Sequence, residues 1–387
     1  MIQILVVGAG LSGCAAAERL ARAGIAVAMV EKSERIGGRV RQYGCKATDR
    51  CNNCGVCLCG GLWEKVENHP RIKLFTSSRL VDLTGGPGMF SATIKTPEGD
   101  LVLDGLHAVV VAAGFEPLTH AGTAHLQTQE LRGVITGTKI EELMMGRDAT
   151  TLFSVPQPRS VAFVQCFGSR DQKEHAAYCS RVCCAYSTRA AKVLRQYYPE
   201  CKIVFFYMEL QSVANRDYYR ELQELGIEFI KCRPLKIEAW DISGVGTVDV
   251  SEGRAGDAAV GGSAAPVCVS YDDPVTGPTA RHFDLVVLSE GIHPAADSVE
   301  LANVCGLQQD DNGFLQLVAG QNGLFVVGCA RQPMKIEESY RDALAAADTI
   351  LAEGTRNSGA RLAAAQLSHS CDMRTPGKCP AEGGAGV

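Results

Sequence analysis

The chain has 387 residues, of which 46% are hydrophobic and 21% charged, and its formal net charge is −5. This is the composition of an ordinary globular protein with room for two domains. A negative balance without a basic run excludes nucleic acid as the expected partner. No apolar stretch approaches the ~20 residues of a membrane span, so we expect no direct membrane insertion. A strand begins within two residues of Met1, so we expect no signal peptide and a cytoplasmic location.

Residues 1–40 have the pattern of a dinucleotide-binding unit. Residues 2–7 are predicted to form a strand, an alanine-rich helix follows, and a second strand at 25–30 ends at Glu31. Three spaced glycines lie between the first strand and the helix: Gly8, Gly10 and Gly13. The first permits a tight turn, the second lets the backbone approach a pyrophosphate, and the third allows close helix–strand packing. Glu31 lies where a carboxylate can accept hydrogen bonds from ribose hydroxyls.

Three later segments favour FAD over NAD at this fingerprint. Gly38 and Arg39 follow Glu31 in an E-x5-GGR pattern, residues 109–117 contain Gly114 in a turn, and residues 323–330 contain Gly328. Together they resemble the glutathione-reductase and thioredoxin-reductase superfamily, in which the first fingerprint binds FAD. The resemblance implies an adenine contact from the strand near Val81. It also implies an apolar helix from about Ile336 to Ala352 whose N-terminus points at the flavin ring.

The stretch from 160 to 197 combines a strand, a loop and a helix with four cysteines: Cys166, Cys179, Cys183 and Cys184. Residues 160–164 are predicted to form a buried strand, and residues 184–197 a helix. In a flavoprotein with two dinucleotide domains, this turn should hold a glycine-rich nicotinamide fingerprint. Here Cys166 and Phe167 occupy the turn, and of the glycines only Gly168 remains. We therefore expect an iron–sulfur cluster here rather than NAD(P)H.

A second group of cysteines lies in residues 45–59. Its core, Cys51, Cys54 and Cys57, has the C-x2-C-x2-C spacing that resembles a ferredoxin ligand loop. A fourth ligand would come from Cys45, Cys59 or elsewhere, and zinc is the structural alternative. A disulfide-reductase dithiol is not expected, because Val40 stands where the first cysteine of the C-x4-C pair should be.

The flavin motifs and the C-x12-C-x3-C-C array of Cys166, Cys179, Cys183 and Cys184 together resemble the A subunit of heterodisulfide reductase and its relatives. The short form is the closer match, similar to the A subunit of the quinone-interacting membrane-bound oxidoreductase complex. The resemblance covers about residues 1–350 and implies a [4Fe–4S] cluster beside FAD. It also implies other redox subunits as partners, and a homodimer is the default assembly. Lys335 departs from the aspartate of that family.

The expected fold is α/β, a thioredoxin-reductase-like flavoprotein with two dinucleotide-binding domains. The FAD domain would comprise residues 1–158, with the cysteine-rich insert at 45–59, and residues 282–353. An inserted NAD-domain-like region with the cysteine array would span 159–281. A flexible tail, 354–387, would carry Cys371 and Cys379.

The expected function is electron transfer. FAD takes up two electrons and releases them singly, so it can join a two-electron reaction to one-electron clusters. The chain would pass electrons between its flavin and [4Fe–4S] clusters of partner subunits, with one cluster of its own and a second at 45–59 left open. No acid–base pair or triad stands out as catalytic. Two alternatives are a free-standing NAD(P)H-dependent flavoprotein reductase and an assembly protein in which FAD and zinc only stabilise the fold.

Overall fold

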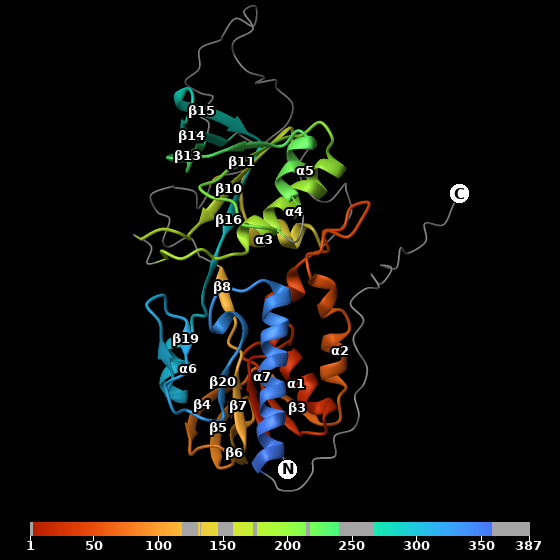
Figure 1. Cartoon of the computed structure of the whole chain (residues 1–387), viewed down its shortest axis with the longest axis vertical. Helices are drawn as coiled ribbons and strands as arrows, with labels where there is room; N and C mark the ends of the chain where they lie inside the picture. Colours follow the sequence, from red (N-terminus) through yellow and green to blue (C-terminus); the bar gives the residue numbers. More distant parts are fainter. Residues whose placement is uncertain are drawn as a thin grey trace, which may run out of the picture.

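The computed structural model describes residues 3–117, 131, 133–145, 158–172, 176–213, 217–239 and 267–357. The chain folds into two lobes, each built around a five-stranded parallel sheet (Figure 1). The α/β fold class predicted from the sequence is confirmed. The tail beyond residue 357, with Cys371 and Cys379, lies outside the described residues.

The first lobe holds the N-terminal fingerprint. Its parallel sheet has the order β20-β7-β1-β2-β3 and comprises β1 (Ile4–Val7), β2 (Val27–Val30), β3 (Ile72–Phe75), β7 (Ala108–Val111) and β20 (Leu324–Val326). β1, β2 and β7 are four-residue apolar runs that are buried throughout. Such continuous apolar strands are expected where a parallel sheet is covered on both faces.

Each face of this sheet has its own covering layer. On one face pack α1 (Leu11–Arg22), α2 (Leu62–Glu67) and α7 (Ile336–Asn357). On the other face lie β4 (Arg79–Thr84), β5 (Phe90–Thr96), β6 (Gly99–Leu106) and α6 (Ser298–Cys305), followed by the short pair β18 (Gln308–Gln309) and β19 (Leu315–Gln316). Figure 1 shows α7, from the end of the chain, lying beside α1 from its beginning.

The second lobe carries the cysteine array. Its sheet has the order β12-β11-β10-β16-β9 and comprises β9 (Val134–Thr136), β10 (Ser160–Phe167), β11 (Lys202–Phe206), β12 (Glu228–Ile230) and β16 (Leu285–Glu290). Its helices are α3 (Gly137–Leu143), α4 (Cys183–Tyr197) and α5 (Tyr218–Glu224). A three-stranded sheet of β13 (Lys236–Ala239), β14 (Val267–Asp273) and β15 (Gly277–Phe283) packs on one face. Phe205 stacks on Phe163 at 4.7 Å between ring centroids, which anchors the other face.

The borders of the second lobe differ from the 159–281 expected for the inserted region. β16 pairs with β10 and also with β9, so residues 134–143 and 285–290 belong to this lobe. The chain crosses between the lobes on β8 (Phe115–Pro117) and β17 (Ile292–Pro294), which pair antiparallel. Short 3-10 turns, η1 (Gly38–Gln42), η2 (Val56–Cys59) and η6 (Gly328–Ala330), complete the described elements near this crossing. Within the described residues, no helix is both long and apolar enough to cross a bilayer.

Candidate cofactor site and cysteine groups

A cavity of about 670 Å³ opens where the two lobes meet. Its walls come from the fingerprint turn, the end of β2, η1, the two crossing strands, α3, α4 and the start of α7. The volume is in the range of sites that enclose a cofactor. Of the residues predicted to bind FAD, the cavity is lined by Gly8, Gly10, Glu31, Gly38, Arg39, Gly114 and Ile336.

The fingerprint glycines have the separate roles expected for them. A Cβ on Gly13 would lie 1.8 Å from the carbonyl oxygen of Gly8, and a Cβ on Gly8 would lie 2.3 Å from that of Ala112. Both positions therefore exclude any side chain. Gly10 is the N-cap of α1 and provides no side chain to bond the free N–H groups of the first turn. An anionic pyrophosphate fits this helix end, because the backbone donors and the helix dipole both favour negative charge.

Glu31 is held by the backbone at the end of β2. Its Oε2 accepts the N–H of Ala9 at 2.7 Å, and its Oε1 accepts the N–H of Ser33 at 2.9 Å. These bonds fix the carboxylate at the cavity wall, where 8% of the residue remains exposed. Each carboxylate oxygen has two lone pairs, so Glu31 can still accept hydrogen bonds from a ribose.

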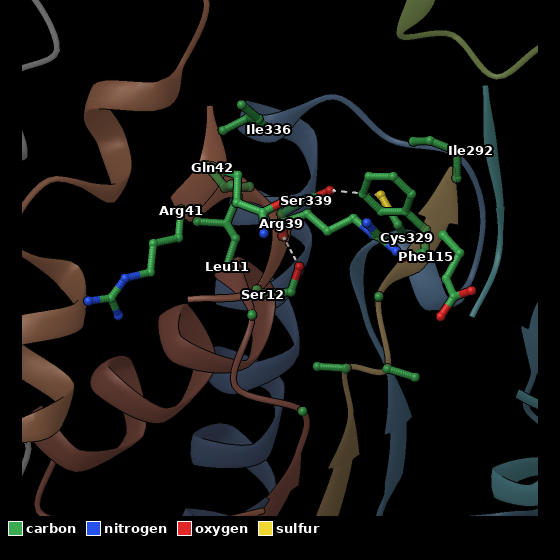
Figure 2. A pocket seen from close by; sticks show the side chains of 18 of the residues that line it. Leu11, Ser12, Arg39, Arg41, Gln42, Phe115, Ile292, Cys329, Ile336 and Ser339 are labelled. Carbon is green, nitrogen blue, oxygen red and sulfur yellow. Dashed lines mark hydrogen bonds between the residues drawn. The ribbon is translucent and has the colours of Figure 1, made fainter. Parts of the chain in front are cut away.

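Arg39 extends along the cavity toward the first crossing strand, whereas Arg41 points away from it (Figure 2). The Nε of Arg39 donates to the carbonyl oxygen of Phe115 at 2.9 Å, and the guanidinium lies 5.7 Å from the centre of that ring. Gly38 precedes it with φ of 55°, and a Cβ there would meet Gly10 Cα at 3.0 Å. The double glycine thus lets η1 pack against the fingerprint turn.

The start of α7 closes the cavity from the other side, with Ile336 and Ser339 facing it (Figure 2). Gly328 lies just behind this wall with φ of 64°, and a Cβ there would lie 2.2 Å from the Ser12 hydroxyl. Val81 also lies outside the lining. The neighbouring residues Ser78, Arg79 and Leu80 form that part of the cavity wall.

A buried polar group at the second-lobe end of the cavity was missed by sequence reasoning. The Nζ of Lys46 donates to Oε2 of Glu141 on α3 and also to the carbonyl oxygen of Gly44, at 3.0 Å for the latter. Both side chains of the pair are under 10% exposed. Burial raises the pKa of Glu141, and Lys46 only partly offsets it. The only signal for this pair in the sequence was a lysine directly after Cys45. Glu141 gave none, because it lies in a segment that was interpreted as a linker without motifs.

Three of the four predicted ligands of the array lie at the turn between β10 and α4. Cys166 lies at the end of β10, while Cys183 and Cys184 begin α4, and all three are at most 2% exposed. Hydrogen bonding with Cys166 and Cys184, together with burial, raises the pKa of the Cys183 thiol. A hydrogen bond with Cys183 lowers the pKa of Cys184 to about 6, against the opposing effect of burial. Cys179 is half-buried on the intervening loop.

The backbone around these cysteines is strained. Among the described residues, five non-glycine positions have positive φ, and three belong to this loop: Cys166 (58°), Arg170 (57°) and Arg181 (62°). Each such residue costs of order 1–3 kcal/mol and persists only where the surroundings impose it, usually at a functional site. The thiol donors, the strained loop and the helix N-terminus that favours thiolates together fit an iron–sulfur cluster.

The second cysteine group lies on the loop between η1 and α2. Cys51 and Cys57 are exposed, Cys45 and Cys54 are half-buried, and Cys59 is buried in the core under α1 and α2. Of these cysteines, Cys54 alone lines the cavity. In the described part of the chain, no three His, Cys, Asp or Glu side chains converge as they would around a single metal ion.

The chain is similar to known proteins, both in its N-terminal part and along most of its length. A model of the NAD(P)-binding Rossmann-like domain matches residues 6–73. The second iron–sulfur A subunit of the CoB–CoM heterodisulfide reductase of Methanopyrus kandleri is 25% identical over 90% of this chain and 64% of its own length. The A subunit of the ferredoxin/F420H2-dependent enzyme of Methanosarcina acetivorans is 23% identical over 90% of this chain and 52% of its own. The chain thus spans about half to two thirds of these relatives.

Solved structures agree on the fold. The thioredoxin reductases of T. acidophilum and Lactococcus lactis each superpose with a TM-score of 0.58 over 91% of this chain and 98% of theirs, at 16% identity. The fold is therefore that of a flavoprotein with two dinucleotide-binding domains, as predicted. Relatives named as heterodisulfide reductase A subunits match about nine tenths of the chain at 23–25% identity, so the chain is similar to these A subunits.

Proposed function

We propose that the chain is an electron-transfer subunit of a heterodisulfide-reductase-like oxidoreductase complex, with FAD in the cavity and a [4Fe–4S] cluster on the four-cysteine array. The observation that carries this proposal is the meeting of Cys166, Cys183 and Cys184 at the turn between β10 and α4. In this fold that turn cradles the pyrophosphate of a nicotinamide cofactor. Thiols in its place favour a one-electron carrier over a hydride donor.

Several residues make the turn between β10 and α4 better suited to cysteine sulfur than to a phosphate group. Cys166 is the last residue but one of β10 and has φ of 58°, at a position where a nicotinamide fingerprint would use a bare glycine. Close to Cys184, the thiol donates to the carbonyl oxygen of Glu209 at 4.0 Å, and the Tyr219 hydroxyl donates to that of Gln211 at 2.5 Å. Hydrogen bonds to thiolates and burial are what set the potential of an iron–sulfur cluster.

FAD, when bound, joins a two-electron reaction to one-electron carriers. The protein supplies the site: the helix end at Gly10 for the pyrophosphate, Glu31 for a ribose, and the Lys46–Glu141 pair at the end nearest the cysteine array. α4 links the two sites, because Ala185 and Tyr186 line the cavity directly after Cys184. This arrangement supports direct electron exchange between the two sites. Partner subunits would then hold the terminal donor and acceptor.

The proposal is tested by the FAD, iron, sulfide and zinc contents of anaerobically purified protein. Wild type is compared with Cys183→Ala and with Cys201→Ala, a matched control that removes a buried thiol from the far end of the same lobe. We expect one FAD per chain in all three, and a loss of about four irons in Cys183→Ala alone. Dithionite should then reduce both the flavin and the cluster of the wild-type protein.

Two results would contradict the proposal. Wild type without iron and sulfide would leave the array without a cluster. Rapid bleaching of the flavin by NADPH or NADH alone would support the alternative, a free-standing nicotinamide-dependent reductase, and would be read from the loss of flavin absorbance on mixing.

A further inference from the structure

The end of the cavity beyond Glu31 is lined by charged side chains. Lys32 follows Glu31 directly, Arg79 begins β4, and Asp297 comes just before α6. FAD has a fixed chemical order, in which the pyrophosphate is followed by a ribose and then by adenine. With the pyrophosphate at the start of α1 and the ribose at Glu31, the adenine belongs at this end of the cavity. We call it the adenosine end.

Asp297 joins the two cations across the adenosine end. Its Oδ1 accepts a hydrogen bond from the Nζ of Lys32 at 2.9 Å, and its Oδ2 lies 3.7 Å from Nη1 of Arg79. The three residues come from three segments of the first lobe, and Lys32 and Asp297 are 265 positions apart in the sequence. These three side chains, named here the Asp297 bridge, therefore connect distant segments of the chain beside the cavity.

The Asp297 carboxylate binds these cations instead of capping its own helix. Aspartate is favoured at a helix N-cap because its carboxylate accepts a backbone N–H of the first turn. Asp217 does so at the N-cap of α5, where it accepts the N–H of Arg220 at 3.1 Å. Asp297 is the N-cap of α6, yet its carboxylate accepts no N–H of that helix, which is described throughout. The carboxylate therefore stabilises the bridge rather than the helix.

The backbone that carries the bridge is fixed on both sides. The turn before β4 contains Ser77, which has φ of 48° although it is not glycine, and such strain persists where the surroundings impose it. The N–H of Ser77 donates to the carbonyl oxygen of Ser33 at 2.9 Å, so the turn before Arg79 is bound to the residue after Lys32. On the other side, α6 and β4 contribute to one buried apolar cluster. The three segments therefore keep a constant separation.

The charges of the bridge depend on one carboxylate. The Asp297 side chain is 17% exposed, whereas those of Lys32 and Arg79 are 35% and 53% exposed. The least solvated charge is thus the negative one that both cations share. Without it, the two cations would lie on either side of the adenosine end and repel each other. Because the cations are partly exposed, salt screens their attraction to the carboxylate.

We propose that the Asp297 bridge closes the adenosine end over bound FAD, and that it makes the site retain FAD in preference to FMN. FMN ends at its single phosphate, so it lacks the adenosine half that the bridge covers. The proposal rests on the proposed function in that it needs FAD in this cavity. Release of FAD would then require the bond between Lys32 and Asp297 to break, whereas release of FMN would not.

The first measurement is the rate of FAD release from the FAD-loaded protein. Protein that carries radiolabelled FAD is mixed with an excess of unlabelled FAD, and the label that remains on the protein is followed over time. We expect Asp297→Asn to release FAD about tenfold faster than wild type, because it breaks two ion pairs and leaves two cations without their shared anion. Salt should accelerate release from wild type more than from Asp297→Asn.

Asp348→Asn is the matched control for this measurement. Asp348 pairs with Arg19 at 2.7 Å in the same lobe, and both residues lie outside the described lining of the cavity. The control therefore removes an aspartate charge and an ion pair without changing the adenosine end. It should release FAD at the wild-type rate.

The second measurement separates the bridge from a general loss of structure. Binding of FAD and of FMN to the apoprotein is followed by the change in flavin fluorescence. Asp297→Asn should weaken FAD binding about tenfold and leave FMN binding unchanged, because FMN does not reach the bridge. Lys32→Gln, which removes the closer cation, should show the same selective loss of FAD binding if Asp297→Asn fails to fold.

The outcomes separate this proposal from the proposed function. Release of FAD from Asp297→Asn at the wild-type rate overturns the bridge, and so does an equal loss of FAD and FMN binding in both variants. Either result leaves the proposed function standing, because FAD still binds to the wild-type protein. Wild-type protein that takes up no FAD would contradict the bridge and the proposed function together.

Discussion

The buried pair of Lys46 and Glu141 gives the sharpest stability prediction. Its side chains are 3% and 7% exposed, so solvent hardly screens either charge. In Lys46→Met the carboxylate loses its ion-pair partner, although Arg189 still acts on it from a longer range. Removing one partner of a buried pair costs 3–5 kcal/mol, and the remaining Arg189 places the expected loss near the lower end, about 3 kcal/mol.

The double variant separates the charge effect from packing. Lys46→Met together with Glu141→Met removes both charges and replaces them with flexible apolar side chains of similar length. Replacing a buried pair in this way is often neutral or stabilising, so we expect the double variant within about 1 kcal/mol of wild type. The two changes should then be strongly non-additive, with the double variant less destabilised than Lys46→Met alone.

Denaturant unfolding of the FAD-loaded protein, followed by circular dichroism, measures these differences. FAD content must be equal in all four proteins, because both residues line the cavity and bound ligand adds to stability. If the double variant were as unstable as Lys46→Met alone, the loss would come from packing around residue 46, and the reasoning about charge would fail.

Further predictions concern the cofactor site, acidity and the core. Gly13→Ala should abolish FAD binding, because the added Cβ would lie 1.8 Å from a backbone oxygen. Gly86→Ala, whose Cβ would lie in open space, should bind FAD normally. The flavin absorbance per chain measures the FAD content of both variants. Burial holds the pKa of Glu141 above 4.5, so this group's stabilising contribution is complete below that pH and is lost as pH rises through the folded pKa. Unfolding at several pH values should show this trend in wild type, and Glu141→Gln should remove it. Phe205→Ala should lower the free energy of unfolding by about 3–5 kcal/mol, because the ring is fully buried against Phe163. Denaturant titration measures this loss, and a value below about 1 kcal/mol would contradict the stacked geometry.

Sequence patterns were sufficient where chemistry and structure are local. The strand, glycine turn, helix and terminal Glu31 lie within 31 consecutive residues, and the structure has each in the expected order. The helix expected at 184–197 is α4, which begins one residue earlier, whereas β10 continues through Cys166 and Phe167, which were expected in the turn. The family resemblance, too, is confirmed by relatives that match nine tenths of the chain. In each case short-range geometry decides the outcome.

Features set by distant partners could not be predicted. The apolar run of β16 could have joined either sheet, and only its register with Val134 and Val161 assigns it to the second lobe. Glu141 lies 95 residues from Lys46, and nothing in its own neighbourhood marks it as buried.

The split first lobe has a consequence for synthesis on the ribosome. β20 completes its sheet beside β7, and α7 covers α1, so this lobe needs residues beyond 320 before its core can close. The strands of the second sheet lie between residues 134 and 290, so that lobe can fold earlier as the chain emerges. Until then, β1 and α1 expose apolar surface that a chaperone would recognise. A ribosome stalled before residue 320 should therefore carry a protease-resistant second lobe and a digestible N-terminus.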